Sequence, residues 1–411
     1  MINIAVLGYG TVGSGVVEVL DTNRECISQR VGEEIRVKYV LDLRDFPGDP
    51  VQNILVHNFE EIIRDEDVKI VVEVMGGIEP AYTFVKRSLL AGKSVATSNK
   101  ALVAKHGAEL LSIAKEKQIN FLFEASVGGG IPIIRPLNSS MTADEIEEIT
   151  GILNGTTNYM LTKMFYEGAG YEEVLRQAQE NGYAEKNPEA DVEGYDACRK
   201  IAILSSLISG HQVDFEDIYT EGITEITERD MEYAKQMQMT IKLLASSRRS
   251  GECLSAIVAP CLLENTHPLF GVNGVFNAIF VHGNVLGDAM FYGSGAGKLP
   301  TASAVVADVV EEAKNLNRNV MTMWKSDKLK LQDKGDTIRR FFVRITGNAE
   351  AMKTYIESIF GPVQIVMLPD VEEEFGFLTG RMTERAYEEC AAKFPNIICM
   401  IRMQEQSGSK E

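Results

Sequence analysis

Short apolar runs alternate with amphipathic stretches over the first third of the chain. The apolar runs are rich in β-branched residues and predict strands at 2–7, 36–41, 70–75, 94–97 and 120–124. Helical periodicity lies between them, for instance at 80–91, where Gly92 is placed to end the helix, and at 100–117. Because strand and helix alternate, this part of the chain predicts a parallel sheet with helices on both faces.

The pattern changes after residue 133. Helical stretches at 156–166 and 171–181 are followed by strand-like runs at 240–246, 255–259, 278–282 and 288–292. This order predicts a mixed α+β domain with a largely antiparallel sheet. Pro300 is placed to start a helix that we expect to fold back on the first domain.

The charged stretch 323–336 lacks apolar periodicity and is typical of a linker. After it, the runs 341–345, 349–359, 364–368, 375–378, 384–392 and 397–403 predict a ferredoxin-like βαββαβ order. The expected organisation is therefore a first domain at 1–133 with a return helix near 300–318, a second domain at 134–299, a linker at 319–336 and a third domain at 337–411.

Composition narrows the class of protein. The chain has 411 residues, of which 45% are hydrophobic and 24% charged, and its formal net charge is −18. That charge disfavours nucleic acid and membrane surfaces as partners. The start of the chain enters a strand without a signal-like segment, and no run approaches the ~20 apolar residues of a membrane span. Six cysteines without a CxxC pair favour reduced thiols, so a cytoplasmic protein is expected.

A glycine fingerprint follows the first strand. The turn reads Gly8-Tyr9-Gly10-Thr11-Val12-Gly13 and opens a helical run, which is the context of a dinucleotide-binding (Rossmann) motif. Gly8 permits the tight turn, Gly10 lets a pyrophosphate approach the backbone, and Gly13 lets helix and strand pack closely. A nicotinamide cofactor, NAD or NADP, is therefore expected.

The end of the second strand leaves the cofactor preference open. An acid at this place accepts from the ribose of NAD, whereas an arginine pairs with the 2′-phosphate of NADP. The chain offers both Asp42 and Arg44. Both are equally compatible with solvated loop charges.

Two lysines stand out. Lys100 begins a helix just after the strand 94–97, where ligands of parallel sheets bind. Asp196 and Lys200 are four residues apart on a helix whose continuation is strongly apolar, so they form either a structural ion pair or part of a site. A lysine with a depressed pKa can exchange the proton that hydride transfer to an aldehyde requires. Glu185 and Asp191 are suited to hold a substrate ammonium group.

Glycine-rich loops at 127–132 and 293–297 and a polar corner at 151–158 complete the set of motifs. They are turns that also allow a ligand to come close. With these segments the chain resembles the homoserine dehydrogenase family over nearly its whole length. The matching segments are 74–80, 97–101, 124–133, 151–158, 182–185, 190–200, 293–297 and 300–304.

The resemblance implies reversible reduction of L-aspartate 4-semialdehyde to L-homoserine, a step toward threonine, methionine and isoleucine. It makes Lys200 the proton donor and places Lys100 at the reaction centre and the cofactor. The residues implied to bind substrate are Glu185, Asp191, Asp196, Tyr183 and Thr156. The implied cofactor contacts are Gly8, Tyr9, Gly10, Thr11, Val12, Gly13, Gly76, Ser98, Lys100 and Gly297.

The family also binds a monovalent cation, sodium or potassium, at a segment matching Glu124, Val127, Gly129 and Ile131. It implies that 134–299 is a catalytic and dimerisation domain in a homodimer or homotetramer, and that the C-terminal domain is ACT-like, with threonine as its effector. The chain departs from the family at Ser294 and Lys298, and the turn 346–349 lacks the usual ACT pattern. An oligomerisation element is therefore the alternative to an effector-binding module in this domain.

Two other functions fit parts of this pattern. One is a Rossmann dehydrogenase for another amino acid aldehyde or keto acid, and the segments 154–158 and 185–200 argue against it. The other is a catalytically silent amino-acid sensor, and the presence of both lysines and all three acids argues against that.

Overall fold

The computed structural model describes residues 1–251, 253–321 and 323–405. The chain divides into two compact units, each assembled from segments that are distant in the sequence. Unit 1 contains Met1–Glu145, Ala202–Phe215 and Phe291–Leu329, and unit 2 contains Ile146–Ile201, Glu216–Met290 and Lys330–Glu411. Among the described residues, no helix combines the length and apolarity needed to cross a membrane.

Unit 1 is built on a parallel six-stranded sheet in the order β3-β2-β1-β4-β5-β6. Its strands are β1 (Ile2–Leu7), β2 (Ile35–Leu41), β3 (Leu55–Val56), β4 (Val68–Glu73), β5 (Ser94–Thr97) and β6 (Phe121–Leu122). This order is that of a doubly wound nucleotide-binding sheet, which confirms the predicted fold class. The short strand β3 is absent from the prediction because two residues carry no periodicity.

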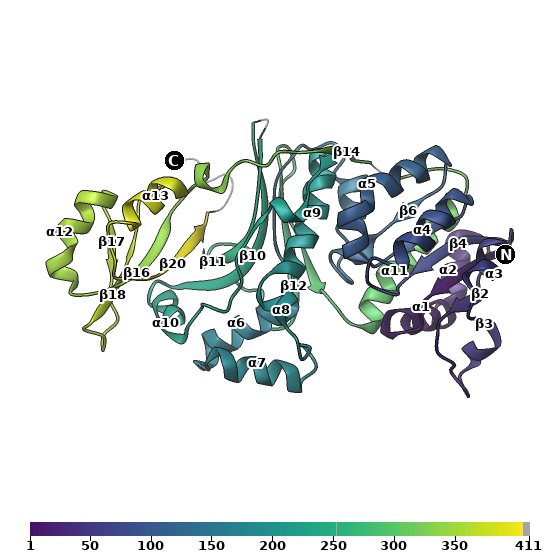
Figure 1. The fold of residues 1–411 in the computed structure, drawn as a ribbon, viewed down its shortest axis with the longest axis horizontal. Coiled ribbons are helices and arrows are strands. Elements are labelled where there is room, and N and C mark those ends of the chain that lie inside the picture. Colours follow the sequence, from purple (N-terminus) through teal and green to yellow (C-terminus); the bar gives the residue numbers. More distant parts are fainter. Residues whose placement is uncertain (252, 322, 406–411) are drawn as a thin grey trace. The chain divides into compact units, whose positions relative to one another are not determined.

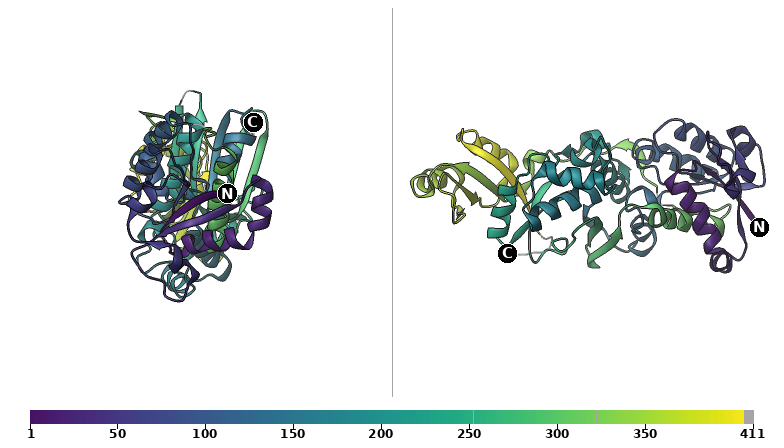
Figure 2. Two further views of the ribbon diagram at one scale, coloured as in Figure 1. Left: turned by 90° about the vertical axis from the view of Figure 1, so that its right-hand side faces the viewer. Right: turned by 90° about the horizontal axis from the view of Figure 1, so that it is seen from below.

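Helices flank this sheet (Figure 1). They are α1 (Thr11–Thr22), α2 (Arg24–Val31), α3 (Phe59–Ile63), α4 (Ala81–Leu90), α5 (Lys100–Glu116) and the returning α11 (Lys298–Lys314). α11 lies beside α1 (Figures 1 and 2), and a Cβ on Gly15 would come within 2.9 Å of the Lys298 carbonyl oxygen. Ala302, Val305 and Val309 of α11 share one core with the first strand.

The rest of unit 1 contains the second part of α9 (Tyr195–Ser209) and the end of β13 (Gly287–Ser294). Its short elements are η1 (Pro50–Ile54), η2 (Glu124–Ser126), η3 (Pro136–Ser140), β8 (His211–Gln212) and β14 (Lys325–Lys328). The charged stretch expected to be a linker therefore includes a strand, β14, which pairs with β8. Trp324 explains why this stretch is fixed in place although it was expected to be a linker. Its ring is buried against Gly107, and its Nε1–H donates to Gln212 at 2.8 Å.

Unit 2 carries helices around a mixed sheet. Its central strands are β7 (Ile146–Ile152), β9 (Tyr219–Thr220), β10 (Met239–Ser250), β11 (Cys253–Glu264), β12 (Phe276–Gly283) and β13 (Gly287–Ser294), the last of which continues into unit 1. The helical elements are α6 (Gly155–Glu167), α7 (Tyr171–Glu180), α8 (Glu189–Val192), the first part of α9 (Tyr195–Ser209), η4 (Phe215–Asp217) and α10 (Glu228–Gln236). The pairs formed by β12, β7, β10 and β11 are antiparallel, as predicted.

The C-terminal part of unit 2 follows the predicted βαββαβ order. It contains η5 (Lys334–Asp336), β15 (Ile338–Arg339), β16 (Phe341–Thr346), α12 (Ala349–Phe360), β17 (Gln364–Val366), β18 (Glu374–Leu378), β19 (Met382–Thr383), α13 (Glu384–Ala391) and β20 (Ile397–Gln404). Both helices pack on one face of these strands (Figure 1) around a core that includes Phe341, Phe360 and Phe377. β20 pairs with β16 and, in parallel, with β11, so the two parts of unit 2 share one sheet.

Candidate functional site

The turn after β1 is shaped by two glycines. Gly8 has a φ of +98° and donates its N–H to the Leu41 carbonyl at 2.7 Å. A Cβ on Gly13 would come within 1.9 Å of the Gly8 carbonyl oxygen, so only glycine allows α1 to approach the turn this closely. Strand, turn and helix are thereby locked in the geometry that sequence analysis predicts.

Gly10, unlike Gly13, lies next to open space. No atom lies within 4 Å of the place where its Cβ would stand, and as the N-cap of α1 it supplies no side-chain acceptor to the helix. The first N–H groups of α1 are thus open to an anion such as a pyrophosphate. A cavity of about 510 Å³ adjoins this turn and is lined by residues including Gly8, Gly10, Asp42, Met75 and Gly76. The residues present therefore fit a dinucleotide.

Asp42 and Arg44 at the end of β2 also line this cavity. Arg44 binds Asp42 through Nε and Nη2, each 3.0 Å from a different carboxylate oxygen, and the Tyr9 backbone N–H donates to Asp42 at 2.8 Å. Hydrogen bonds from Arg44 and the backbone hold the pKa of Asp42 well below its usual range, although burial opposes them. Asp42 is therefore an ionised acceptor where a ribose is expected, and Arg44 is already paired with it.

Two residues that sequence analysis missed shape the loop after β4. The buried Glu73 accepts hydrogen bonds from the Met75 N–H at 2.8 Å and from the Thr97 hydroxyl at 2.6 Å, and burial raises its pKa. Asn99 caps α5 through the Leu102 N–H and donates to the Gly77 carbonyl at 2.5 Å. Together they hold the loop that contains Gly76 beside Ser98 and Lys100, the residue with which α5 begins.

In unit 2, four predicted or neighbouring residues form one hydrogen-bonded group. Lys200 Nζ donates to Asp196 Oδ2 at 2.6 Å and to the Leu153 carbonyl at 2.7 Å. Asn154 Nδ2 donates to Asp196 Oδ2 at 3.0 Å and to Asp191 Oδ1 at 2.7 Å. Lys200 is only 8% exposed and Asp196 only 5%, so the group is largely shielded from water. The structure thus brings together Asp191, Asp196 and Lys200.

Asn154 is the centre of this group and is absent from the predicted substrate-binding residues. It ends the β7–α6 corner, where its Oδ1 accepts the Thr157 N–H at 2.9 Å as the N-cap of α6. One amide side chain therefore fixes both the start of a helix and the positions of two carboxylates. The signal in the sequence is an asparagine directly before a helical run, which is typical of an N-cap.

The other predicted substrate residues lie close to this corner along the chain. Thr156 on α6 donates to the Tyr183 carbonyl at 2.6 Å, and the rings of Tyr183 and Tyr159 pack 5.0 Å apart. The Glu185 side chain is exposed, and its backbone carbonyl accepts from Gln179. In the described residues, Glu185 lies outside the hydrogen-bonded group of Lys200.

The predicted cation segment in unit 1 is a buried loop next to η2. The Glu124 carboxylate accepts three backbone N–H groups, from Ile133 at 2.6 Å, Ile134 at 2.8 Å and Arg135 at 2.7 Å. A Cβ on Gly129 would come within 2.2 Å of the Gly295 carbonyl, so the two glycine loops approach each other closely. Because the Glu124 side chain is occupied, a cation here would be held by backbone carbonyls, which are suitable oxygen ligands. A cation at this loop stays a prediction.

Two units thus offer complementary chemistry. Unit 1 is built to hold a dinucleotide, and unit 2 contains a buried lysine that can carry a proton. Hydride transfer to a carbonyl requires both, so the class of protein is a nicotinamide-dependent oxidoreductase.

Comparison with known proteins gives the family. The model described as "Homoserine dehydrogenase, NAD binding domain" matches residues 8–124, and the model described as "Homoserine dehydrogenase" matches residues 132–310. The homoserine dehydrogenase of Bacillus subtilis is 43% identical over 323 residues, which are 78% of this chain and 74% of the relative. The chain belongs to the homoserine dehydrogenase family.

Solved structures support the same family assignment. A homoserine dehydrogenase from Thiobacillus denitrificans superposes with a TM-score of 0.89 and 34% identity, covering 98% of both chains. A hyperthermophilic archaeal homoserine dehydrogenase in complex with NADPH gives a TM-score of 0.66 and 29% identity, covering 77% of this chain and 99% of that one. The superposition with the Thiobacillus protein extends over the C-terminal part of the chain.

Proposed function

We propose that this protein catalyses the reversible, nicotinamide-dependent interconversion of L-homoserine and L-aspartate 4-semialdehyde. The observation that carries the proposal is the buried group formed by Lys200, Asp196, Asn154 and Asp191. It combines a proton carrier with carboxylates that suit the ammonium group of an amino acid. The family of the chain and its dinucleotide cradle support the same reaction.

Lys200 is the proposed proton carrier. In the direction of reduction its ammonium donates a proton to the oxygen of the aldehyde, and in the direction of oxidation its neutral amine accepts the proton of the hydroxyl group. Asp196 and the Leu153 carbonyl hold Nζ in place and fix the direction from which the proton arrives. A bound nicotinamide would supply the hydride chemistry, giving a hydride to the aldehyde carbon in its reduced form and accepting one from the alcohol carbon in its oxidised form.

The remaining substrate and cofactor residues are assigned from their positions. Asp191, with Glu185, is proposed to bind the substrate ammonium, and Thr156 and Tyr183 line the same corner. Lys100 is proposed to face the reaction centre from the start of α5. The proposed cofactor contacts are Gly8, Tyr9, Gly10, Thr11, Val12, Gly13, Gly76, Ser98 and Gly297.

A monovalent cation, sodium or potassium, is proposed at the backbone carbonyls of Glu124, Val127, Gly129 and Ile131. Glu124 would organise this loop through the three N–H groups it accepts. Removing the cation is expected to raise the KM for the substrate, because the loop that approaches Gly295 would lose its central charge. Titrating sodium or potassium into enzyme that has been desalted into a buffer free of both cations measures this effect.

The C-terminal domain at 337–411 is proposed to be an ACT-like domain that binds threonine, in a cytoplasmic homodimer or homotetramer. Its βαββαβ order supports this assignment. The remaining proposed boundaries are 1–133 with the return helix near 300–318 for the dinucleotide-binding domain, 134–299 for the catalytic and dimerisation domain, and 319–336 for the linker. Unchanged kinetics in the presence of threonine would remove the effector from this proposal.

The deciding experiment mixes the purified protein with L-homoserine and either NAD or NADP and follows the absorbance of the reduced nicotinamide. Homoserine-dependent reduction of either cofactor is the expected result. A matched mixture with the Lys200→Ala variant shows that the signal belongs to this site. If the folded protein gives no signal with homoserine or with aspartate semialdehyde, the proposal fails, and a panel of other amino acid alcohols then distinguishes a different substrate from a silent sensor.

A further inference from the structure

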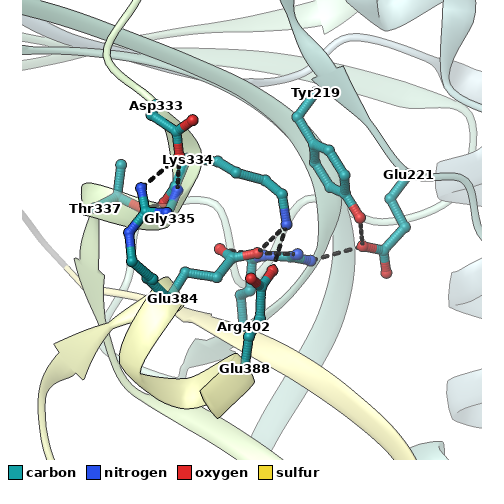
Figure 3. Close-up of polar contacts among 10 residues, drawn as sticks. Tyr219, Glu221, Asp333, Lys334, Gly335, Thr337, Glu384, Glu388 and Arg402 are labelled. Atoms are coloured by element: carbon teal, nitrogen blue, oxygen red, sulfur yellow. Dashed lines mark hydrogen bonds and ion pairs between the residues drawn. The ribbon is translucent and has the colours of Figure 1, made fainter. Parts of the chain in front are cut away.

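Arg402 on β20 is the centre of a buried ion network (Figure 3). Its side chain is almost completely enclosed, with 2% of the residue exposed. The guanidinium binds Glu384 of α13 through two parallel contacts, Nη2 to Oε1 at 2.6 Å and Nε to Oε2 at 3.0 Å. Its remaining nitrogen, Nη1, donates to Glu221 Oε2 at 2.7 Å. One arginine therefore joins the C-terminal part of unit 2 to the segment that follows β9.

The carboxylates of Glu384 and Glu221 stabilise the charged form of Arg402. Burial alone lowers the pKa of Arg402, but the hydrogen bonds with Glu384 and the charge of Glu221 outweigh it and raise the pKa overall. Tyr219 strengthens the contact, since its hydroxyl donates to Glu221 Oε2 at 3.1 Å and its ring faces the guanidinium, 5.2 Å from Cζ. The Oε2 atom of Glu221 thus accepts two hydrogen bonds, one from Arg402 and one from Tyr219.

Lys334 of η5 completes the network on the other side of Glu384. Its Nζ donates to Glu384 at 3.0 Å and to Glu388 at 2.9 Å, and it lies 4.5 Å from the centre of the Tyr219 ring. Figure 3 shows that Glu388 points toward Lys334, whereas Glu221 points toward Arg402. Besides the central Glu384, the network therefore contains two glutamates with different partners, and of these two only Glu221 directly follows β9.

The segment that carries Glu221 supports the short helix α8. The Ile223 N–H donates to the Val192 carbonyl at 2.8 Å, at the end of that helix. A Cβ on Gly222 would come within 2.2 Å of the same carbonyl oxygen and 2.6 Å of the Glu193 Cα, so the two backbones are in direct contact. A displacement of this segment cannot be absorbed by side chains and must move the end of α8.

The same segment also supports the turn between α8 and α9. Gly194, with a φ of +80°, lies against Thr220 and Val258, to which a Cβ would come within 3.2 and 3.1 Å. The Glu221 N–H donates to the Val258 carbonyl at 2.8 Å, which anchors the segment to β11. Asp191 and Asp196 are the acids on either side of this turn, and Asn154 binds both of them.

We propose that Arg402 and Glu221 are positioning residues that set the affinity for the amino acid substrate by fixing the backbone that carries Asp191 and Asp196. This proposal rests on the proposed function, in which those acids belong to the substrate site. It assigns to the C-terminal domain a direct structural contribution to the substrate site, through a contact that any ordering or loosening of that domain would alter.

The first test compares Glu221→Ala with the matched variant Glu388→Ala. Both remove one glutamate from the same network, but only Glu221 is joined to the segment that supports α8. Glu221→Ala is expected to raise the KM for homoserine roughly threefold to tenfold while leaving the KM for the nicotinamide cofactor unchanged. Glu388→Ala is expected to change neither. The conservative variant Glu221→Gln, which keeps an acceptor for Arg402, is expected to restore most of the affinity.

The second test does not depend on turnover. Hydrogen exchange of the peptides that contain Ile223 and residues 189–196 is expected to accelerate in Glu221→Ala and to match the wild type in Glu388→Ala. Equal KM values for homoserine in the wild type and Glu221→Ala, or equal rises for homoserine and cofactor, would overturn the proposal. So would unchanged exchange in these peptides. A wild-type protein that does not oxidise homoserine would instead overturn the proposed function. Hydrogen exchange would still show whether loss of the Arg402–Glu221 contact loosens residues 189–196.

Discussion

Lys200 and Asp196 form an ion pair across one turn of α9, with 2.6 Å between Nζ and Oδ2. Both side chains are almost completely buried, and Nζ also donates to the Leu153 carbonyl. A buried pair of this kind costs desolvation energy for both ions, so it contributes little net stability. Its geometry is better explained by the need to hold one amine in one orientation.

Lys200→Ala is expected to lower kcat by roughly 10²–10⁴-fold, because the alkoxide or hydroxyl group loses its proton carrier. Cofactor affinity is expected to remain at the wild-type value, as measured by calorimetric titration with the reduced nicotinamide. Lys200→Arg separates charge from proton transfer, since a guanidinium keeps the charge but does not release a proton at accessible pH. Turnover near the wild-type rate in either variant would remove Lys200 from the mechanism.

Gly10→Ala is expected to lose cofactor affinity, whereas Gly13→Ala is expected to lose stability. A methyl group on Gly10 meets no protein atom, so this variant should unfold at the wild-type urea concentration but lose cofactor affinity, because the methyl group occupies the place of the pyrophosphate. A methyl group on Gly13 collides with the Gly8 carbonyl, which should destabilise unit 1 by about 1–3 kcal/mol. Urea unfolding and cofactor titration of both variants check this. A Gly10→Ala protein that binds cofactor normally would show that the cradle is not used.

Asp42→Ala is expected to shift cofactor preference from NAD toward NADP. In the wild type the carboxylate is free of a proton and offers an acceptor to the ribose of NAD, while Arg44 is held by it. Loss of one charged acceptor should lower kcat/KM for NAD by about tenfold. The released guanidinium should improve kcat/KM for NADP through its 2′-phosphate. Asp42→Ala/Arg44→Ala serves as the control, in which the gain with NADP should disappear.

Lys242 on β10 predicts an unusual pH dependence of stability. It is 1% exposed, and its Nζ donates to the Val272 carbonyl at 2.7 Å, to Asn273 at 2.9 Å and to Asn158 at 3.1 Å. Burial lowers the pKa of Lys242 to about 7. The cost of burying its charge is therefore fully present below pH 7. It is relieved as pH rises toward the pKa of the unfolded chain.

The difference in unfolding free energy between wild type and Lys242→Met isolates this effect. Between neutral pH and the ordinary lysine pKa the unfolded chain binds one proton more than the native protein, so wild-type stability should gain up to about 1.4 kcal/mol per pH unit relative to Lys242→Met. Urea titrations at several pH values measure the slope. A flat difference would mean that the three oxygen acceptors keep the amine protonated.

The central strands of the unit 1 sheet were predictable because they are almost completely buried. Short runs rich in β-branched residues, such as 2–7 and 94–97, coincide with β1 (Ile2–Leu7) and β5 (Ser94–Thr97). Fully buried strands carry this signal without help from distant residues. The same holds for the glycine turn, since its conformation is required locally by the close approach of Gly13 to Gly8.

The substrate corner was predictable only in part. The spacing of Asp196 and Lys200 places them on one helical face, and Asp191 joins them because the chain turns back at Gly194. That Asn154 bridges the two acids depends on contacts between positions 37 and 42 residues apart, for which a single sequence carries no signal. The bond between Arg402 and Glu221 spans 181 residues, and arginine in a strand otherwise suggests an exposed position.

The discontinuous composition of both units determines how the chain can fold as it is synthesised. The face of α1 that α11 covers stays uncovered until residues 298–314 have left the ribosome, and β11 gains its neighbour β20 only after residues 397–404 follow. A nascent chain therefore carries exposed apolar surface through most of its translation, which favours chaperone capture over early independent folding. Because each unit is made of three separate segments, no single proteolytic cut can separate the two units. The dinucleotide-binding half therefore cannot be released intact from the half that carries Lys200.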